Sequence, residues 1–338
     1  MNDFRSDNTH GASPEITDAL ARVSMGNKTS YGNDEITHRV RDRVRELFET
    51  DCEVLPVSTG TAGNALSIAA MTPPWGGVFC HDDAHVHRDE MGAPEFFSGG
   101  AKLFPIEGAN GKLDAATLAE TIDDIACEGR TAQPSVVSLT QATEAGTVYS
   151  IDEIRALCDV AHARGCRVHV DGARFANAVV SLSGSLADMT WRAGVDVLVL
   201  GATKNGALAA ELIVMFDKTL AAEMLTRWHR GGHRLSKMRF LSVQFDAYFE
   251  NDLWLRNARH ANAMARRLGA GVPELLRPVE ANVVFARLLP QQVQSLQQQG
   301  FLFYDWPLFG EGAVRFVCGF STGEQEVDAL LAALHSAR

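Results

Sequence analysis

Short apolar runs alternate with helical patterns between residues 135 and 216, and this alternation narrows the choice of folds further than any other property of the sequence. Ser150 and Glu153 have the S-x-x-E spacing of a capping box, and apolar residues then recur at helical intervals up to Gly165. A further helical stretch is expected around Ser185–Ala193. The apolar runs that predict buried strands are Ser135–Leu139, Cys166–Val170, Val195–Leu200 and Leu212–Phe216. This order predicts an α/β fold with right-handed crossovers and a mostly parallel sheet covered on both faces.

The pattern changes after Phe216. Long helical patterns extend from about Thr219 to Leu268, with an interruption at Arg230, and shorter mixed segments follow. These segments predict a compact α+β unit of roughly one hundred residues. We therefore expect two domains, with the boundary near Ser236. Residues 1–236 would form an N-terminal arm and a large domain, and residues 237–338 a small C-terminal domain.

Composition restricts the partners and the compartment. The formal net charge of −11 argues against nucleic acid or an anionic membrane as the main partner. The six cysteines include no C-x-x-C pair, which is typical of reduced thiols in the cytosol. The first ten residues, MNDFRSDNTH, are too polar for a signal peptide, and no apolar run approaches ~18 residues. We expect a soluble cytoplasmic protein.

A single lysine, Lys204, stands in the segment GATKNGA between the last two apolar runs. Two interpretations are open for it. In the first, Lys204 lies in a turn and points into water, as most lysines do. In the second, its small neighbours leave space for a bound molecule. An amine in such a poorly solvated pocket can form a Schiff base with a carbonyl group.

Asp171 follows the apolar run Cys166–Val170 and is expected at the carboxyl edge of the sheet, where ligands bind in open α/β folds. Taken alone, it is equally well a helix N-cap. Its functional interpretation is a charge partner for the protonated ring nitrogen of pyridoxal phosphate, whose aldehyde Lys204 would reach from a neighbouring strand. Each of the two residues makes the functional interpretation of the other stronger.

The segment STGTAGNALSIAAM opens a helix with glycine and hydroxyl residues, which suits an anion. It has neither the G-x-x-x-x-G-K-[ST] pattern nor the dinucleotide pattern, so it gives only weak support to a nucleoside triphosphate or a nicotinamide cofactor. Together with Asp171 and Lys204, it predicts the phosphate cup of a pyridoxal phosphate site.

Three histidines, His81, His85 and His87, stand among acidic residues. Their spacing matches no standard zinc pattern, so we expect no metal site there. A histidine on the face of a cofactor ring is the better functional interpretation, because a flat imidazole stacks on the ring and also moves protons.

Seven motifs follow one another in a fixed order: RSDN, SYGND, TGTAGN, AHVHRDEMGAPEFFSGG, HVDGARFANA, GATKNGA and VRFVCGF. In this order they resemble the low-specificity L-threonine aldolases, which are grouped with the β-eliminating lyases among the fold-type I pyridoxal phosphate enzymes. The resemblance covers nearly the whole chain, and HVDGAR and the lysine motif are its most specific parts. It implies the transferase-like fold of that class, pyridoxal 5′-phosphate as the cofactor, and a carbon–carbon lyase.

The resemblance also implies a role for each matching residue around the cofactor. Lys204 would hold the internal aldimine, Asp171 would pair with the pyridine nitrogen, and His85 would stack on the ring. The phosphate would be bound by Thr59, Gly60 and Thr61. The substrate carboxylate would be bound by Ser6, Arg174 and Arg315, since a guanidinium group suits that task, and Arg174 would also lie beside the cofactor.

Three further matches imply an oligomer. Tyr31, Arg227 and Arg234 match positions that reach across a subunit interface, Tyr31 toward the substrate and the two arginines toward the phosphate. A closely packed dimer with shared active sites is therefore the implied active unit, doubled to a homotetramer.

One position departs from the family. Several members have the motif ENTHN where this chain has residues 140–144, and Thr143 stands at the place of its histidine, near the substrate hydroxyl. A threonine hydroxyl is too weakly basic to take a proton at neutral pH, so we expect Thr143 to orient the substrate or a water molecule. His85, directly or through water, is then the expected catalytic base.

The implied activity is reversible retro-aldol cleavage of β-hydroxy-α-amino acids. L-Threonine or L-allo-threonine would give glycine and acetaldehyde, and phenylserine is a bulkier candidate substrate. Two alternatives stay open. One is β-elimination from a cysteine- or serine-like amino acid on the same scaffold. The other is a catalytically silent pyridoxal phosphate fold, against which the intact pair of Lys204 and Asp171 argues.

Overall fold

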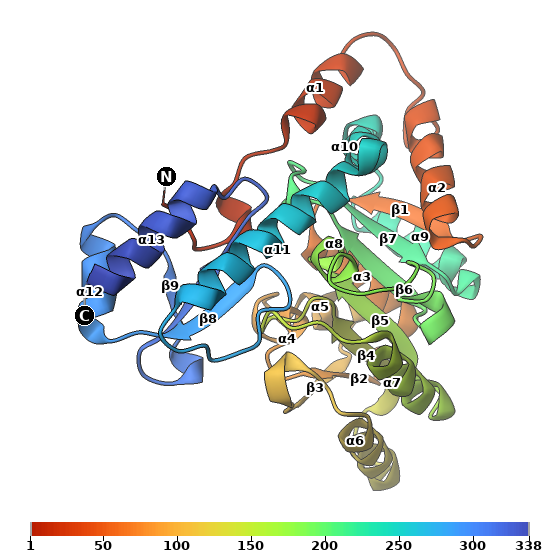
Figure 1. Ribbon diagram of the computed structural model, residues 1–338. Coiled ribbons are helices and arrows are strands. Elements are labelled where there is room, and N and C mark those ends of the chain that lie inside the picture. The colour runs from red at the N-terminus through yellow and green to blue at the C-terminus, as the bar shows by residue number, and fades with distance from the viewer. Residues whose placement is uncertain (1, 337–338) are drawn as a thin grey trace.

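A seven-stranded sheet lies at the centre of the computed structural model, which describes residues 2–336 (Figure 1). Its strands are β1 (Glu53–Val57), β2 (Gly76–His81), β3 (Lys102–Ile106), β4 (Gln133–Thr140), β5 (Arg167–Gly172), β6 (Val197–Gly201) and β7 (Glu211–Met215). Their order across the sheet is β1-β7-β6-β5-β4-β2-β3. β7 is antiparallel to both of its neighbours, and the other adjacent strands are parallel. The predicted mostly parallel sheet is confirmed.

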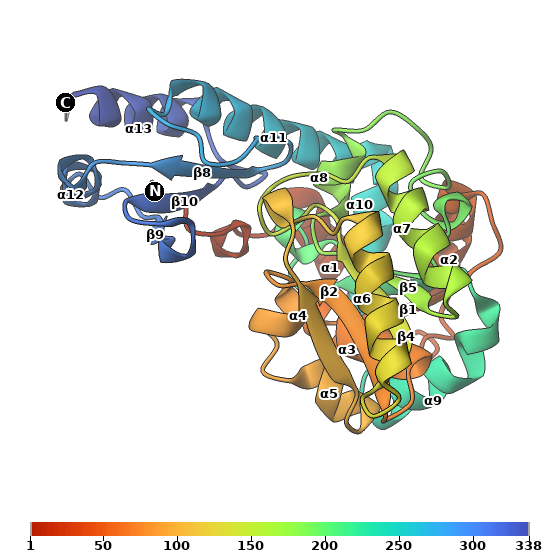
Figure 2. The same ribbon diagram turned by 90° about the horizontal axis from the view of Figure 1, so that it is seen from below.

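Helices cover both faces of this sheet, as predicted (Figure 2). One apolar core includes side chains of α2, α7 and α10, and the other includes side chains of α3 and α9. Leu198 belongs to the first core and Val197 to the second, because successive side chains of a strand point to opposite faces. The helices are α1 (Pro14–Val23), α2 (Glu35–Phe48), α3 (Gly60–Met71), α4 (His85–Arg88), α5 (Ala93–Ser98), α6 (Ala115–Glu128), α7 (Ile151–Ala163), α8 (Phe175–Val179), α9 (Ala221–Arg230) and α10 (Arg239–Phe249).

Of two local predictions made from the sequence, one is confirmed and one is wrong. The capping box of Ser150 and Glu153 is present at the start of α7. The helix expected around Ser185–Ala193 is wrong, because that segment forms turns and a single 3-10 turn at Trp191–Ala193. The backbone pairing is not that of an α-helix, because the N–H groups of Thr190 and Arg192 both donate to Ala187 O, three and five positions back, instead of four.

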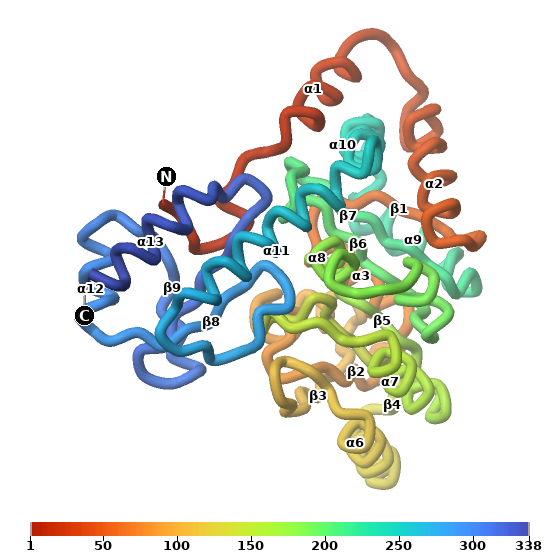
Figure 3. The backbone as a smooth tube through the Cα atoms, viewed as in Figure 1, coloured from red at the N-terminus to blue at the C-terminus, as the bar shows by residue number. Residues whose placement is uncertain are grey.

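The C-terminal part contains a second, antiparallel sheet of order β8-β10-β9. Its elements are α11 (Leu253–Gly271), β8 (Val283–Arg287), α12 (Pro290–Gln298), β9 (Tyr304–Asp305), β10 (Ala313–Val317) and α13 (Glu324–Ser336). The first residues of the chain join this part, and the chain then crosses to α1 (Figure 3). Phe4 is buried in the apolar core of the small sheet, where it packs edge-on against Phe316.

The two parts of the molecule meet along α11. Ala258, in its first half, belongs to the core of the large sheet, and Met264, in its second half, belongs to the core of the small sheet. The domain boundary near Ser236 stays a prediction. None of the helices formed by residues 2–336 combines the length and the apolar character that a membrane span requires.

Candidate active site

A cavity of about 320 Å³ opens at the carboxyl edge of the large sheet. It is lined by residues that directly follow β1, β4 and β6 and by the end of β5. Because β7 runs antiparallel to its neighbours, its first residue, Glu211, lies at the same edge. The topology therefore gathers polar side chains from distant parts of the sequence around one space.

Lys204 lines this cavity from a 3-10 turn, η4 (Thr203–Asn205). The turn is fixed because the buried amide of Asn205 donates to Tyr248 Oη at 2.7 Å and to Trp254 O at 2.8 Å. Among residues 2–336, Lys204 Nζ has no hydrogen-bond or ion-pair partner. Burial, followed by the positive charge of Arg174, lowers the pKa of Lys204. Lys204 thus faces the cavity with its preference for the charged form weakened.

Asp171 lies at the end of β5 and is buried. Its Oδ1 accepts from the backbone N–H of Ala173 at 2.9 Å, and its Oδ2 accepts from Asn64 Nδ2 at 2.9 Å. It caps no helix, since α8 begins at Phe175 and has Arg174 as its N-cap residue. One lone pair of each oxygen is used, and the carboxylate is held rigidly at the wall of the cavity.

A hydrogen-bonded chain connects Asp171 to His85. Asn64 Nδ2 also donates to Glu90 Oε1 at 2.8 Å, and that oxygen accepts from His85 Nδ1 at 2.9 Å. The bond to Glu90 raises the pKa of His85, while burial raises the pKa of Glu90. His85 lines the cavity, so its ring is positioned from behind by a buried carboxyl group.

The other two histidines lie apart from this arrangement. Both ring nitrogens of His81 are used, one by Gly108 O at 2.9 Å and the other by the N–H of Asp83 at 3.0 Å. His87 is exposed.

The start of α3 forms one end of the cavity. Thr59 is the N-cap of this twelve-residue helix, and its Oγ1 accepts from the N–H of Ala62 at 3.1 Å. A Cβ atom added to Gly60 would meet nothing within 4 Å, so the space in front of the helix is open. The helix dipole and the free N–H groups of its first turn make this end suitable for an anion.

A second cavity, of about 580 Å³, adjoins the first, and Lys204, Arg174 and His85 line both. Arg174 forms two hydrogen bonds with the buried Asp7, at 2.7 and 2.9 Å. Arg315 comes from β10 of the small sheet and lies over the ring of Trp306, 4.3 Å from its centroid. Ser6 lies at the same wall.

The guanidinium group of Arg315 is incompletely paired. Its Nε is buried without a hydrogen-bond partner among residues 2–336. Burial, together with the positive charge of Arg174, lowers the pKa of Arg315 to about 10. Two cations therefore converge on the second cavity, and one of them has a donor free for an incoming carboxylate.

Thr143 does not reach either of these cavities. Its side chain is fully buried, and its Oγ1 is hydrogen-bonded to Thr147 Oγ1 at 2.8 Å. The next residue, Glu144, lines both cavities instead. Residue 143 packs inside the turn after β4, and residue 144 points outward from that turn.

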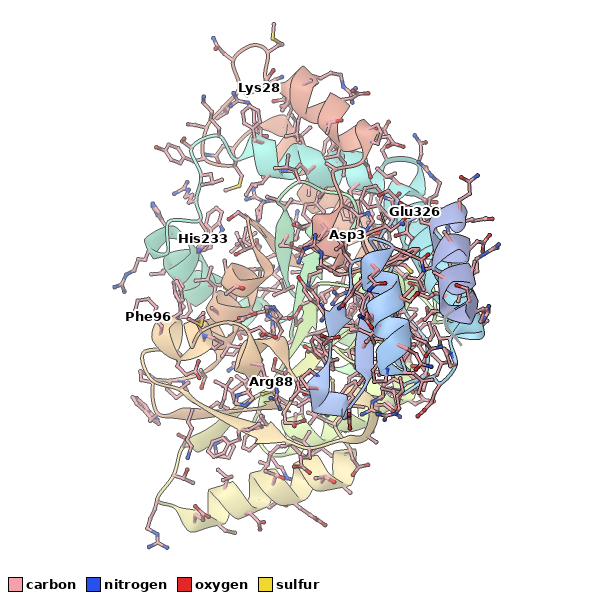
Figure 4. All side chains as sticks on the ribbon, turned by 90° about the vertical axis from the view of Figure 1, so that its left-hand side faces the viewer. Asp3, Lys28, Arg88, Phe96, His233 and Glu326 are labelled. Atoms are coloured by element: carbon pink, nitrogen blue, oxygen red, sulfur yellow. The ribbon has the colours of Figure 1, made fainter. Side chains whose placement is uncertain are left out.

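Tyr31, Arg227 and Arg234 lie away from Lys204 within the chain. Arg234 stacks on Tyr31, 5.6 Å from the ring centroid, and both line a third cavity of about 800 Å³. Arg227 bonds to Phe97 O at 2.8 Å and to Glu223 at 2.7 Å. Figure 4 shows His233, the neighbour of Arg234, on the same outer edge as Phe96, whereas Arg88 lies beside the small sheet. That Tyr31, Arg227 and Arg234 reach into the active site of a partner subunit stays a prediction.

Comparison with known proteins agrees with this geometry. The family model for beta-eliminating lyases matches residues 3–289. The chain belongs to the beta-eliminating lyase family. A low specificity L-threonine aldolase of Pseudomonas aeruginosa is 44% identical over 335 residues, which are 97% of this chain and 95% of that protein. Within the beta-eliminating lyases, this sequence thus lies near proteins named for threonine cleavage.

Solved structures agree with the architecture of this beta-eliminating lyase. A threonine aldolase of Leishmania major superposes with a TM-score of 0.93 at 26% identity and covers 99% of both chains. A tryptophan decarboxylase of Catharanthus roseus has a TM-score of 0.77 at 14% identity, covers 99% of this chain and 83% of its own, and shares the fold alone. The chain has the fold-type I architecture that its motifs implied.

Several polar residues of this beta-eliminating lyase site were missed at the level of sequence. They are Asp7, Asn64, Glu90, Glu144 and Glu211. Three of them stand inside the quoted motifs RSDN, TGTAGN and AHVHRDEMGAPEFFSGG, so proximity to a motif was an available signal. Glu144 and Glu211 have no such signal, because only the folded sheet brings them to the cavity.

Proposed function

We propose that this protein cleaves β-hydroxy-α-amino acids by a retro-aldol reaction, with L-threonine and L-allo-threonine giving glycine and acetaldehyde. The observation that carries the proposal is Lys204, an amine without a hydrogen-bond or ion-pair partner among residues 2–336, at the junction of the two cavities. The relatives named above support the reaction and its substrate class.

We propose pyridoxal 5′-phosphate as the cofactor, and the donor set fits it. The open first turn of α3, with Thr59, Gly60 and Thr61, suits the phosphate. Asp171 offers a buried carboxylate to a ring nitrogen, and Lys204 offers an amine to an aldehyde. The bound cofactor would supply an electron sink for the bond that breaks at Cα.

The protein's own residues would orient the amino acid. Arg174 and Arg315 would bind its carboxylate, since both guanidinium groups face the second cavity. Asp7 would hold Arg174 in place through its two hydrogen bonds. Fixing the carboxylate sets the torsion about the bond to Cα, and alignment of the bond to be broken accounts for much of the rate in reactions of this kind.

Product analysis tests this proposal against β-elimination, which would use the same lysine and cofactor. The purified protein, supplied with pyridoxal phosphate, is incubated with L-threonine, L-allo-threonine, phenylserine, L-serine and L-cysteine. Retro-aldol cleavage of threonine releases glycine and acetaldehyde in equal amounts. Pyruvate and ammonia from serine or cysteine, with no aldehyde from threonine, would replace the proposal by β-elimination.

We also propose a cytoplasmic protein that works as a dimer with shared sites, doubled to a tetramer. Tyr31 and Arg234 line a third cavity, apart from Lys204. This position supports shared active sites, because within one chain the two residues would not contact a substrate bound at Lys204. Light scattering of the purified protein measures the oligomeric state directly.

A further inference from the structure

Glu144 carries a buried oxygen that nothing in the described chain uses. Its Oε2 has no hydrogen-bond partner among residues 2–336. Glu144 stands four residues after the end of β4 and lines both cavities where they meet, together with Lys204 and Arg174. An unpaired buried acceptor costs free energy, so its presence at the junction indicates that a ligand group completes it.

The other oxygen of this carboxyl group fixes its direction. Glu144 Oε1 accepts from the backbone N–H of His85 at 2.8 Å and from Thr140 Oγ1 at 3.0 Å. These two donors come from different elements, α4 and the end of β4, and together they fix the orientation of the carboxyl group. Oε2 is therefore presented at a fixed position, which is what a group that receives a proton from a substrate requires.

The electrostatic environment makes Glu144 a stronger base than an exposed carboxylate. Burial, and after it the negative charge of Asp171, raises the pKa of Glu144. Arg174 faces the same junction with its positive charge. A carboxylate with a raised pKa is a stronger base than one exposed to water.

The two other candidates for the base are less well placed. Thr143 is fully buried with its hydroxyl engaged by Thr147. His85 keeps its Nδ1 against Glu90, and its raised pKa leaves more of the imidazole protonated at neutral pH. The contact with Glu90 fixes the direction of the imidazole, which suits a place on the cofactor ring better.

We propose that Glu144 is the catalytic base that accepts the proton of the substrate's β-hydroxyl group at its Oε2. The proposal rests on the retro-aldol function proposed above. As Glu144 takes the proton, the O–H electron pair becomes the second bond of the aldehyde C=O. The Cα–Cβ bond breaks, and its electron pair stays with Cα, which then takes up a proton to give glycine. Glu144 finally returns its proton to water.

The test compares two reactions at the same site, of which only one requires a base at a hydroxyl group of the substrate. Cleavage of threonine requires removal of the hydroxyl proton, whereas exchange of the α-hydrogen of glycine in deuterated water does not, since glycine has no hydroxyl group. Glu144→Gln keeps an oxygen for the donors from His85 and Thr140 but cannot take a proton. We expect threonine cleavage to fall by about 10²–10⁴-fold, with glycine exchange within about threefold of the wild type.

The matched control is Glu95→Gln. Glu95 lies on α5, outside both cavities, and also has a buried oxygen without a partner in the described chain. Both reactions, and retention of the visible absorbance of bound cofactor, should match the wild type. Equal loss of cleavage and exchange in Glu144→Gln would overturn the proposal, because it would place Glu144 at a step common to both reactions.

Near-wild-type cleavage of threonine by Glu144→Gln would also overturn the proposal that Glu144 is the base. The proposed retro-aldol function would then still stand. If the wild-type protein releases no aldehyde from threonine but exchanges glycine, the function proposed above fails first. Aldehyde is measured with a coupled dehydrogenase, and exchange by proton NMR, so the two failures are read from different signals.

Discussion

Lys204 allows a direct chemical test of the site, because its amine has no partner among residues 2–336 and burial lowers its pKa. Borohydride reduces an imine to a stable amine, so treatment of the protein loaded with pyridoxal phosphate should fix the cofactor to the peptide that contains Lys204. Mass spectrometry of the digest identifies the modified residue. Lys218, an exposed lysine paired with Asp51, is the control.

Lys204→Ala should lose the fixed adduct, and Lys218→Ala should keep it. Attachment of the cofactor at another lysine in the wild type would remove Lys204 from its proposed role.

Glu211 should give the cofactor-free protein an unusual dependence of stability on pH. Burial raises the pKa of Glu211 from 4.5 to about 7. Between these two values the unfolded chain has released the proton while the folded protein still holds it. The contribution of Glu211 to the free energy of unfolding therefore falls as pH rises from about 4.5 to about 7.

Glu211→Gln removes this contribution. Relative to the wild type, its urea midpoint should rise steadily across that pH window. A difference between the two proteins that stays constant with pH would contradict the assignment.

The packing of α3 on the sheet offers a test at Gly63. A Cβ atom added there would lie 2.6 Å from Cγ1 of the fully buried Val199 on β6. Alanine gains about 1 kcal/mol in helix propensity over glycine. Overpacking a core costs about 1–3 kcal/mol, and the branched side chain of Val199 has little freedom to move.

We expect Gly63→Ala to lower the melting temperature and to weaken cofactor retention, because α3 carries the phosphate turn. Gly11→Ala, at a position where a Cβ would meet nothing within 4 Å, is the control. Equal melting temperatures for the two variants would mean that α3 can shift on the sheet at no cost.

Sequence patterns predicted those parts of the fold that depend on neighbours along the chain. The capping box of α7 and the apolar strands are of this kind. The antiparallel direction of β7 was overlooked, although the nine residues between β6 and β7 are too few for the crossover that parallel strands need. The turns at residues 185–193 were missed because apolar spacing does not report the backbone pairing, in which Thr190 and Arg192 both donate to Ala187 O.

Those site residues that stand at the ends of predicted strands could be predicted from the sequence. Lys204 and Asp171 stand directly at such ends, and the structure brings both to one cavity. Asp7 lies in the motif RSDN, but its pairing with Arg174 could not be predicted, because the two residues are 167 positions apart. Glu144 was overlooked because the family pattern drew attention to the preceding threonine, and only the fold shows which of the two points outward.

Sharing of sites between subunits predicts complementation. In a dimer of Lys204→Ala with Arg234→Ala, one site would contain both wild-type residues, because each site would take its lysine from one chain and its arginine from the other. Mixing the two inactive variants under conditions of subunit exchange should restore threonine cleavage. The cavity shared by Tyr31 and Arg234, apart from Lys204, motivates the experiment.

The matched control is a mixture of Lys204→Ala with Arg174→Ala. Arg174 and Lys204 line the same cavities of one chain, so no hybrid has an intact site and no recovery is expected. Recovery in neither mixture would argue that each subunit works alone.

The path of the first residues affects when the protein becomes competent during its biosynthesis. Phe4 N–H donates to Leu302 O, and Val317 N–H donates to Phe4 O, each at 2.8 Å. Phe4 therefore finds its backbone partners about 300 positions further along the chain. Asp7, three positions further on, forms its two hydrogen bonds with Arg174. A nascent chain bearing the complete large sheet would still lack a finished binding site for an amino acid until residues 302–317 have also been made.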